Sequence, residues 1–66
     1  MADGEEMLTT SEAGALLGVD RHTIARWVRL NQMLAVRLPS GTLRVPRAEV
    51  DRVLRELREE RERRGE

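Results

Sequence analysis

The 66-residue sequence has no cysteine, no lysine, no tyrosine and no phenylalanine, and it holds one histidine and one tryptophan. Without cysteine, the chain has neither disulfides nor thiolate ligands for a metal ion. It also has no glycine-rich phosphate loop and no carboxylates paired in a plausible pocket, so the usual groups of an active site are missing. We therefore expect no bound metal, no cofactor and no enzymatic activity.

Long apolar runs are also absent. No stretch approaches the roughly 20 apolar residues of a membrane span, and the acidic start MADGEEM is unlike a signal peptide. We therefore expect a soluble cytoplasmic protein, associated with the nucleoid if it binds DNA, with no membrane partner. Its thin aliphatic core should pack around Trp27. The alternative role for this side chain is stacking on an unpaired base.

The charged residues are unevenly distributed along the chain. The formal net charge is zero because 12 basic residues balance 12 acidic ones. Residues 1–20 hold five acids and no base, residues 21–47 hold six arginines and no acid, and residues 48–66 hold seven acids and six arginines. Because a ligand responds to the local field, the middle third is where an anionic partner would bind.

Two short helices are predicted in the first half of the chain. Thr9 and Glu12 have the spacing of a capping box, which predicts a helix over residues 10–17 that Gly18 ends in a left-handed conformation. Asp20 is the expected N-cap of a second helix over residues 21–31. The inner face of the first helix is expected to hold Ala13, Leu16 and Leu17. The second helix should place Ile24, Trp27, Val28 and Asn31 on one face, and His22, Arg26 and Arg29 on the opposite one.

A β-hairpin is predicted next, with strands in residues 34–38 and 43–45 and a turn over residues 39–42. If the apolar residues of both strands face the core, Leu38 pairs with Leu43 and Val36 pairs with Val45. Arg37 then lies directly opposite Arg44, which is unfavourable unless a phosphate sits between or beside them. The alternative is that both arginines splay into water, where screening makes their repulsion small.

A third helix should follow Pro46, with an apolar stripe formed by Val50, Val53, Leu54 and Leu57. The expected organisation is a disordered acidic N-terminus over residues 1–7, one domain over residues 8–57, and a charged, frayed helical tail over residues 58–66. The stripe ends after two turns, which is too short for a coiled-coil seam. We therefore expect no stable dimer in solution.

The first two helices fit a helix-turn-helix. Gly18 suits the turn, Ala13 and Gly14 leave room for a close contact, and Ile24 and Trp27 anchor the second helix. The segment from about Leu8 to Leu57, above all GVDRHTIARW and VRLPSGTLRVPRAEV, resembles the small winged helix-turn-helix domain of excisionases and MerR-type regulators. That resemblance implies a mainly helical fold with a two-stranded wing, a second helix that enters the DNA major groove, and the hairpin as a wing beside it.

The candidate DNA-binding residues lie on the second helix and the hairpin. His22 and Thr23 are placed to approach bases, Arg26 is suited to a bidentate guanine contact, and Arg21 and Arg29 are suited to phosphates. The wing candidates are Arg37, Ser40, Gly41, Thr42 and Arg44, and Arg47 is a further candidate for a phosphate contact. The alternative is that the arginines form only a solvated helix face.

Three functions remain open from the sequence. The first is an excisionase, a factor that sets the direction of recombination and binds adjacent DNA sites cooperatively, with an integrase or another copy of itself as partner. The second is a compact MerR-like transcription regulator, although we expect no small-molecule ligand because no effector domain follows. The third is a protein-binding module that docks a recombinase or polymerase through its last helix or its apolar surface near Leu30, Met33 and Leu34.

Overall fold

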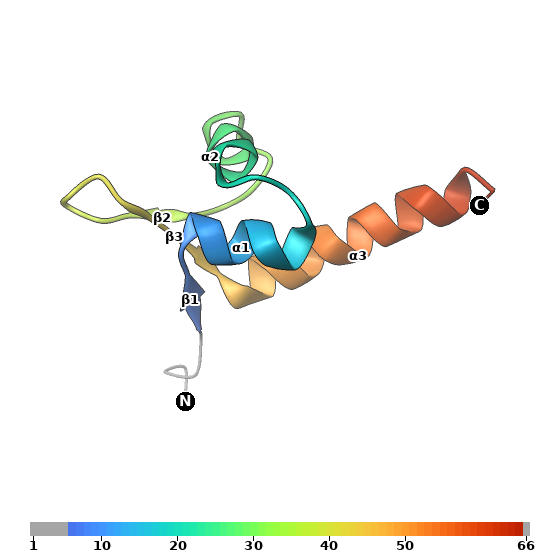
Figure 1. The fold of residues 1–66 in the computed structure, drawn as a ribbon, viewed down its shortest axis with the longest axis horizontal. Coiled ribbons are helices and arrows are strands. Elements are labelled where there is room, and N and C mark those ends of the chain that lie inside the picture. The colour runs from blue at the N-terminus through green and yellow to red at the C-terminus, as the bar shows by residue number, and fades with distance from the viewer. Residues whose placement is uncertain (1–5, 66) are drawn as a thin grey trace.

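Three helices and a small antiparallel sheet make up residues 6–65, the part of the chain that the computed structural model describes (Figure 1). The strand order is β1-β3-β2, so β3 is central. The mainly helical, winged helix-turn-helix class predicted from the sequence is confirmed. In chain order the elements are β1 (Met7–Leu8), α1 (Thr10–Leu17), α2 (Arg21–Arg29), β2 (Val36–Arg37), β3 (Leu43–Pro46) and α3 (Arg47–Arg63).

Helix α1 begins and ends as its sequence predicts. The Glu12 backbone N–H donates to the Thr9 hydroxyl at 3.0 Å, and the Thr9 backbone N–H donates to the Glu12 carboxylate at 2.9 Å. Gly18 ends the helix with φ of 75°, in the left-handed region that glycine adopts without strain. The expected inner face is wrong at Leu16, which is 45% exposed, while Ala13 and Leu17 are buried.

The turn between α1 and α2 packs directly on α1 at Gly14. The Val19 backbone N–H donates to the Gly14 carbonyl at 2.9 Å. A Cβ on Gly14 would lie 2.6 Å from the Val19 carbonyl oxygen, closer than atoms can approach without a shift. The absence of a side chain at this position therefore sets how closely the turn approaches α1.

Helix α2 is shorter than predicted. It ends at Arg29, and Asn31 has φ of 63°, so Asn31 leaves the helix and is exposed instead of joining the apolar face. Asparagine tolerates this left-handed conformation better than most residues. Asp20 occupies the N-cap position, but its side chain makes no capping hydrogen bond, contrary to expectation. Its backbone carbonyl accepts from the N–H groups of Thr23 and Ile24 instead.

The register of the wing differs by one residue from the predicted one. Val36 pairs with Arg44 and Arg37 pairs with Leu43. The Leu38 N–H donates to the Thr42 carbonyl at 2.8 Å, so the loop has three residues and not four. Gly41, with φ of 93°, makes this shorter loop possible.

A shift of one residue moves every side chain to the other face of a strand. Val36 is therefore not in the core and is 49% exposed. Directly opposite residues share a face, so Arg37 shares a face with Leu43, and Arg44 shares the other face with Val36. The predicted Arg37–Arg44 pair is wrong, and the two arginines project from opposite faces of the ribbon.

The strand β1 was not predicted. Met7 pairs with Pro46 and Leu8 pairs with Val45, and the Arg47 N–H donates to the Glu6 carbonyl at 2.8 Å. The expected disordered segment therefore extends too far at Met7, while residues 1–5 lie outside the described residues. Two residues carry no periodicity of their own, so only pairing with β3 makes this segment a strand.

The core lies where α1, α2 and α3 meet β3. Ile24 and Val45 are fully inaccessible and Val50 is 1% exposed, while Trp27 is half-buried against this cluster, as expected of a core residue. The buried apolar set is Leu8, Ala13, Leu17, Ile24, Met33, Val45, Val50 and Val53.

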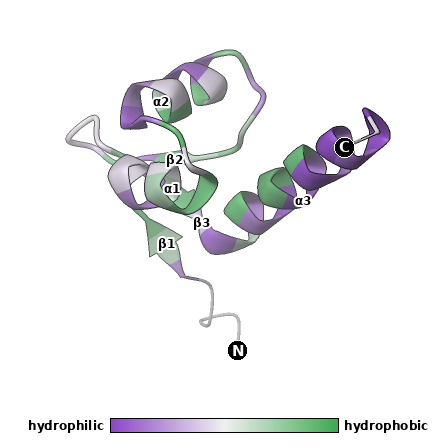
Figure 2. Cartoon of the chain, turned by 45° about the vertical axis from the view of Figure 1, so that its right-hand side comes forward, coloured by the Kyte–Doolittle hydropathy of each residue, from purple (hydrophilic) through white to green (hydrophobic). Residues whose placement is uncertain are grey.

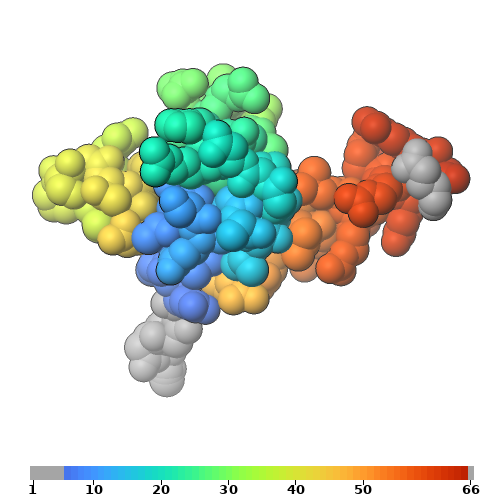
Figure 3. Space-filling model, viewed as in Figure 1, coloured from blue at the N-terminus to red at the C-terminus, as the bar shows by residue number. Residues whose placement is uncertain are grey.

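The apolar stripe of α3 leaves the core before the helix ends. Val53 is 7% exposed, whereas Leu57 is 37% exposed. Hydropathy colouring shows α3 becoming continuously hydrophilic towards its C-terminal end (Figure 2), and this end projects away from the body (Figure 3). None of the helices within residues 6–65 combines the length and apolar character needed to cross a membrane.

Candidate nucleic-acid interface

Helix α2 presents its cationic side outward. Ile24 is completely buried beneath it, while His22, Arg26 and Arg29 are exposed. This follows from the helical repeat, which separates the apolar positions from these three side chains. The predicted outward row of His22, Arg26 and Arg29 is therefore present.

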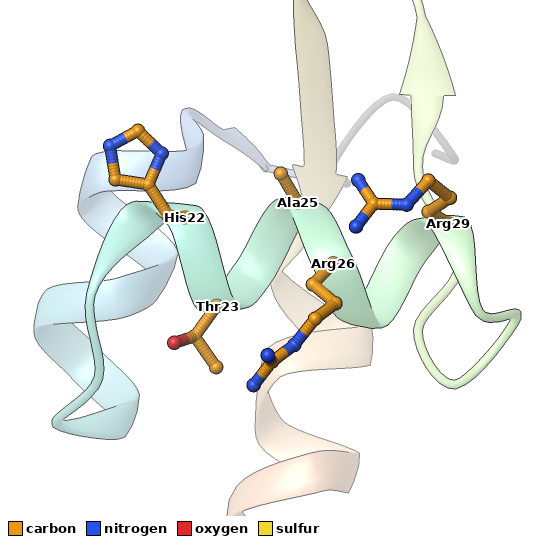
Figure 4. Close-up of a pocket in the computed structure, with 5 residues that line it drawn as sticks. All are labelled: His22, Thr23, Ala25, Arg26 and Arg29. Carbon is orange, nitrogen blue, oxygen red and sulfur yellow. The ribbon is translucent and has the colours of Figure 1, made fainter.

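An open hollow lies along this side of α2, lined by His22, Thr23, Ala25, Arg26 and Arg29. Figure 4 shows His22, Ala25 and Arg29 along one edge of the helix, and Thr23 and Arg26 along the other. The sequence analysis missed Ala25, the short side chain between His22 and Arg29. Arg21, also exposed, occupies the first position of α2 outside the hollow.

The arginines of α2 and the wing form no ion pair with any carboxylate in residues 6–65. The ion pairs found there involve only Arg47, Arg52 and Arg63 of α3 and Arg64, the residue that follows it. An arginine without an internal carboxylate partner keeps its planar fork of donors available for a phosphate or a base edge. This condition holds, within the described residues, for Arg21, Arg26, Arg29, Arg37 and Arg44.

The wing offers fewer free polar groups than its sequence suggests. The Ser40 hydroxyl donates to the Thr42 hydroxyl at 3.1 Å and accepts from the Thr42 N–H at 3.5 Å. The Gly41 N–H donates to the Leu38 carbonyl at 2.7 Å, so it is not free to bind DNA. Arg37 is exposed, whereas Arg44 is half-buried and donates to the Leu43 carbonyl at 3.3 Å.

Arg47 is not brought together with the α2 row. Its guanidinium lies 3.3 Å from the Asp51 carboxylate and 3.6 Å from the Glu6 carboxylate. Arg47 begins α3 beside β1, and a phosphate would have to compete with both carboxylates. The predicted phosphate contact of Arg47 therefore finds no support in this geometry.

Comparison with known proteins agrees with this geometry. A family model for the helix-turn-helix domain matches residues 7–58, which covers both helices of the motif, the wing and most of α3. The chain belongs to this helix-turn-helix domain family. Membership implies DNA binding. Searches of the curated proteins and of the solved structures each returned no match.

In this helix-turn-helix domain, an ion pair between the buried Glu49 and the partly exposed Arg52 holds the connection between α2 and the wing. Glu49 is 8% exposed, and its carboxylate accepts from the Leu34 N–H at 2.9 Å. Arg52 binds the same carboxylate through two donors, at 2.6 and 3.2 Å, and also reaches the Gln32 carbonyl at 3.5 Å. Residues 32–34, which lead from α2 to the wing, are thus tied to α3.

The electrostatics of this pair are mutually stabilising. The hydrogen bonds from the Arg52 guanidinium hold the pKa of the Glu49 carboxyl below its ordinary value, against the opposing effect of burial. The same bonds, with a further one to Glu56, raise the pKa of Arg52. Sequence reasoning missed Glu49, because its i, i+3 spacing to Arg52 is a common surface pattern that does not reveal a backbone partner 15 residues away.

Among residues 6–65, no three histidine, cysteine, aspartate or glutamate side chains gather where they would hold a metal ion. The side chains that line the α2 face offer hydrogen bonds, positive charge and apolar contact. Their donors are guanidinium, imidazole and hydroxyl groups.

Proposed function

We propose that this protein is a non-enzymatic, sequence-selective binder of double-stranded DNA that places α2 in the major groove. The observation that carries this proposal is the outward row of His22, Arg26 and Arg29 on α2, without an ion pair to any carboxylate of residues 6–65. The B-DNA major groove is about 12 Å wide and admits a helix. Charge of this sign, concentrated on one helix face, draws a polyanion even though the whole chain is neutral.

The side chains of α2 are suited to base contacts or to phosphate contacts according to their chemistry and their position on the helix. Arg26, in the middle of the exposed row, has the forked donors that bind guanine O6 and N7. His22 and Thr23 stand near the helix start, the part of a recognition helix that approaches base edges. Arg21 and Arg29 lie towards the two ends of α2, where contact with the phosphates on each side of the groove positions the helix.

The wing adds phosphate contacts on the adjacent backbone or in the minor groove. Arg37 and Arg44 project from opposite faces of the β2–β3 ribbon. A ribbon that lies between two phosphate rows presents one guanidinium to each, so the two arginines bind separate phosphates. Ser40, Gly41 and Thr42, at the tip, contribute close backbone approach and hydroxyl groups more than free N–H donors.

Within DNA binding, we favour an excisionase that sets recombination direction and acts cooperatively on adjacent sites in nucleoid DNA of the cytoplasm. This finer role rests on the resemblance of the GVDRHTIARW segment and on the small number of available contacts. One domain with about five cationic contacts binds weakly at physiological salt. Neighbouring copies, or an integrase, would supply the missing affinity. A compact MerR-like transcription regulator fits the same face.

A second function, the docking of a recombinase or polymerase, is favoured by three exposed apolar residues between the end of α2 and β2. Leu30, Leu34 and Val36 are 55%, 72% and 49% exposed. This function is compatible with DNA binding, because these residues lie outside the outward row of α2. Met33, expected with them, is 2% exposed and belongs to the core.

Selection of duplexes from a random library, followed by mobility-shift titration of the enriched site, tests the proposal. We expect one enriched sequence and steeper binding on fragments that carry two or more adjacent sites. Failure to enrich any sequence would remove the proposed function. Independent binding to adjacent sites would remove the cooperative role but leave DNA recognition in place.

A further inference from the structure

The hollow along α2 has an apolar residue, Ala25, between longer polar side chains. Ala25 lies three positions after His22 and four before Arg29, and Figure 4 shows it between them on the same edge of the helix. A row of long polar side chains therefore has one gap, with a methyl group at its base. Thr23 also lines the hollow, but it lies on the other edge of the helix and points away from Ala25.

The apolar base of this gap disfavours most of the groups that the major groove displays. Guanine, adenine and cytosine present hydrogen-bond donors or acceptors there, whereas thymine adds a 5-methyl group. Ala25 has no side-chain donor or acceptor, so a polar base edge placed on it would lose water without gaining a hydrogen bond. A methyl group placed there gives up no hydrogen bond to water, and the contact buries apolar surface of both the methyl group and Ala25.

We propose that Ala25 is a specificity-determining residue and that the hollow above it receives the 5-methyl group of a thymine in the bound site. This inference rests on the proposed binding of α2 in the major groove. It adds one element that the arginines do not provide, since guanidinium groups select guanine or phosphate. Arg26, on the other edge of the helix, reads a nearby guanine.

Replacement of thymine by deoxyuridine in the enriched duplex removes the methyl group and leaves the hydrogen-bonding edge unchanged. Each thymine of the site is replaced in turn, and affinity is measured by mobility shift. We expect one thymine per bound copy at which the replacement weakens binding about fourfold, the value of one buried methyl-sized group. Unchanged affinity at every thymine, with specific binding intact, would overturn the inference while sparing the proposed function.

The variant Ala25→Gly links this effect to the residue. We expect it to bind the thymine and deoxyuridine duplexes equally well, so the fourfold difference disappears. Ala48→Gly is the control, because it makes the same substitution at an exposed alanine in the first turn of another helix, α3. Ala48→Gly should keep the fourfold difference, and an Ala25→Gly protein that also keeps it would overturn the inference.

A second variant tests the space itself. Ala25→Leu fills the hollow, so we expect it to lose the preference for thymine at that position when the library selection is repeated. Thermal unfolding shows whether the variant is folded, and a folded variant that enriches the wild-type site unchanged would contradict the proposal. If the wild-type protein enriches no duplex at all, the proposed function fails first, and this inference fails with it.

Discussion

The arginines of α2 and the wing differ from those of α3 in their surroundings. Residues 21–47 contain six arginines and no acid. Of these six arginines, only Arg47, the first residue of α3, forms an ion pair with a carboxylate of residues 6–65. Arg52 and Arg63 of α3, and Arg64 directly after it, also pair with glutamates. The arginines of residues 21–46 thus have no carboxylate in their own segment, whereas those of α3 alternate with glutamates and some of them form ion pairs with these glutamates.

The two regions also point in different directions. The wing projects from one side of the body beside α2, and the C-terminal end of α3 projects from the opposite side (Figure 1). The net charge of zero therefore does not predict whether the protein binds DNA, because a duplex contacts one of these surfaces and not the other. Segregation of charge along the chain becomes segregation of charge in space.

The largest expected effect is on DNA affinity. Reversing the charge of one arginine on α2 and one on the wing, in Arg26→Glu with Arg44→Glu, should weaken binding about 1,000-fold, or about 4 kcal/mol, because two attractive contacts become repulsive. Mobility shift measures the loss, and circular dichroism checks the fold.

The matched control for that variant is Arg55→Glu with Arg58→Glu. These two arginines are exposed on α3 and make no ion pair within residues 6–65, so the net charge changes equally. We expect a change in affinity of less than about threefold, from screened long-range charge alone. An equal loss of DNA affinity in both double variants would show that the arginines of α2 and the wing contribute no more to binding than those of α3.

The next effect concerns the ion pair between Glu49 and Arg52, which ties residues 32–34 to α3. Glu49→Ala leaves the Leu34 N–H and the Arg52 guanidinium without their shared acceptor, so it should lower the free energy of unfolding by about 2–4 kcal/mol. Urea unfolding measures this. Glu56→Ala, at an exposed partner of the same arginine, should cost less than about 1 kcal/mol. Similar losses of unfolding free energy in the two variants would show that burial of the Glu49 carboxylate does not increase its contribution to stability.

A smaller effect is expected with pH. The pKa of Glu49 is lowered in the folded state, so its contribution to stability is complete above the ordinary value of 4.5 and is lost as the pH falls through the folded pKa. Glu49→Gln should remove that part of the acid dependence. Unfolding free energies measured between neutral and acid pH test this, and an identical fall in wild type and variant would exclude Glu49 as its source.

The ends of α1 and the helix-turn-helix were predicted correctly from short sequence patterns. The register of the wing was not. The Thr9–Glu12 box and Gly18 act within a few residues, so the sequence reveals both ends of α1. The wing register depended on whether the loop has three or four residues, a choice that Gly41 decides through its positive φ. Apolar alternation alone could not detect it, because Val36 is exposed on a wing that extends beyond the core.

The candidate site shows the same division. Helical periodicity alone predicted the row of His22, Arg26 and Arg29, because it depends only on spacing along α2. Arg47 looked like the other cations of the middle third, and only the fold brings Glu6 to it across β1 and β3. Ala25 was not predicted from the sequence, because a short apolar residue forms the base of a hollow only when longer side chains surround it in the fold.

The salt dependence of binding measures most directly how many arginines of α2 and the wing bind phosphates. With phosphate contacts from Arg21, Arg29, Arg37 and Arg44, the logarithm of the binding constant should fall against the logarithm of salt concentration with a slope of about −4. Arg29→Ala and Arg37→Ala should each flatten this slope by about one, while Arg58→Ala leaves it unchanged. A slope near zero, or one that Arg58→Ala flattens as much as Arg29→Ala, would contradict the account.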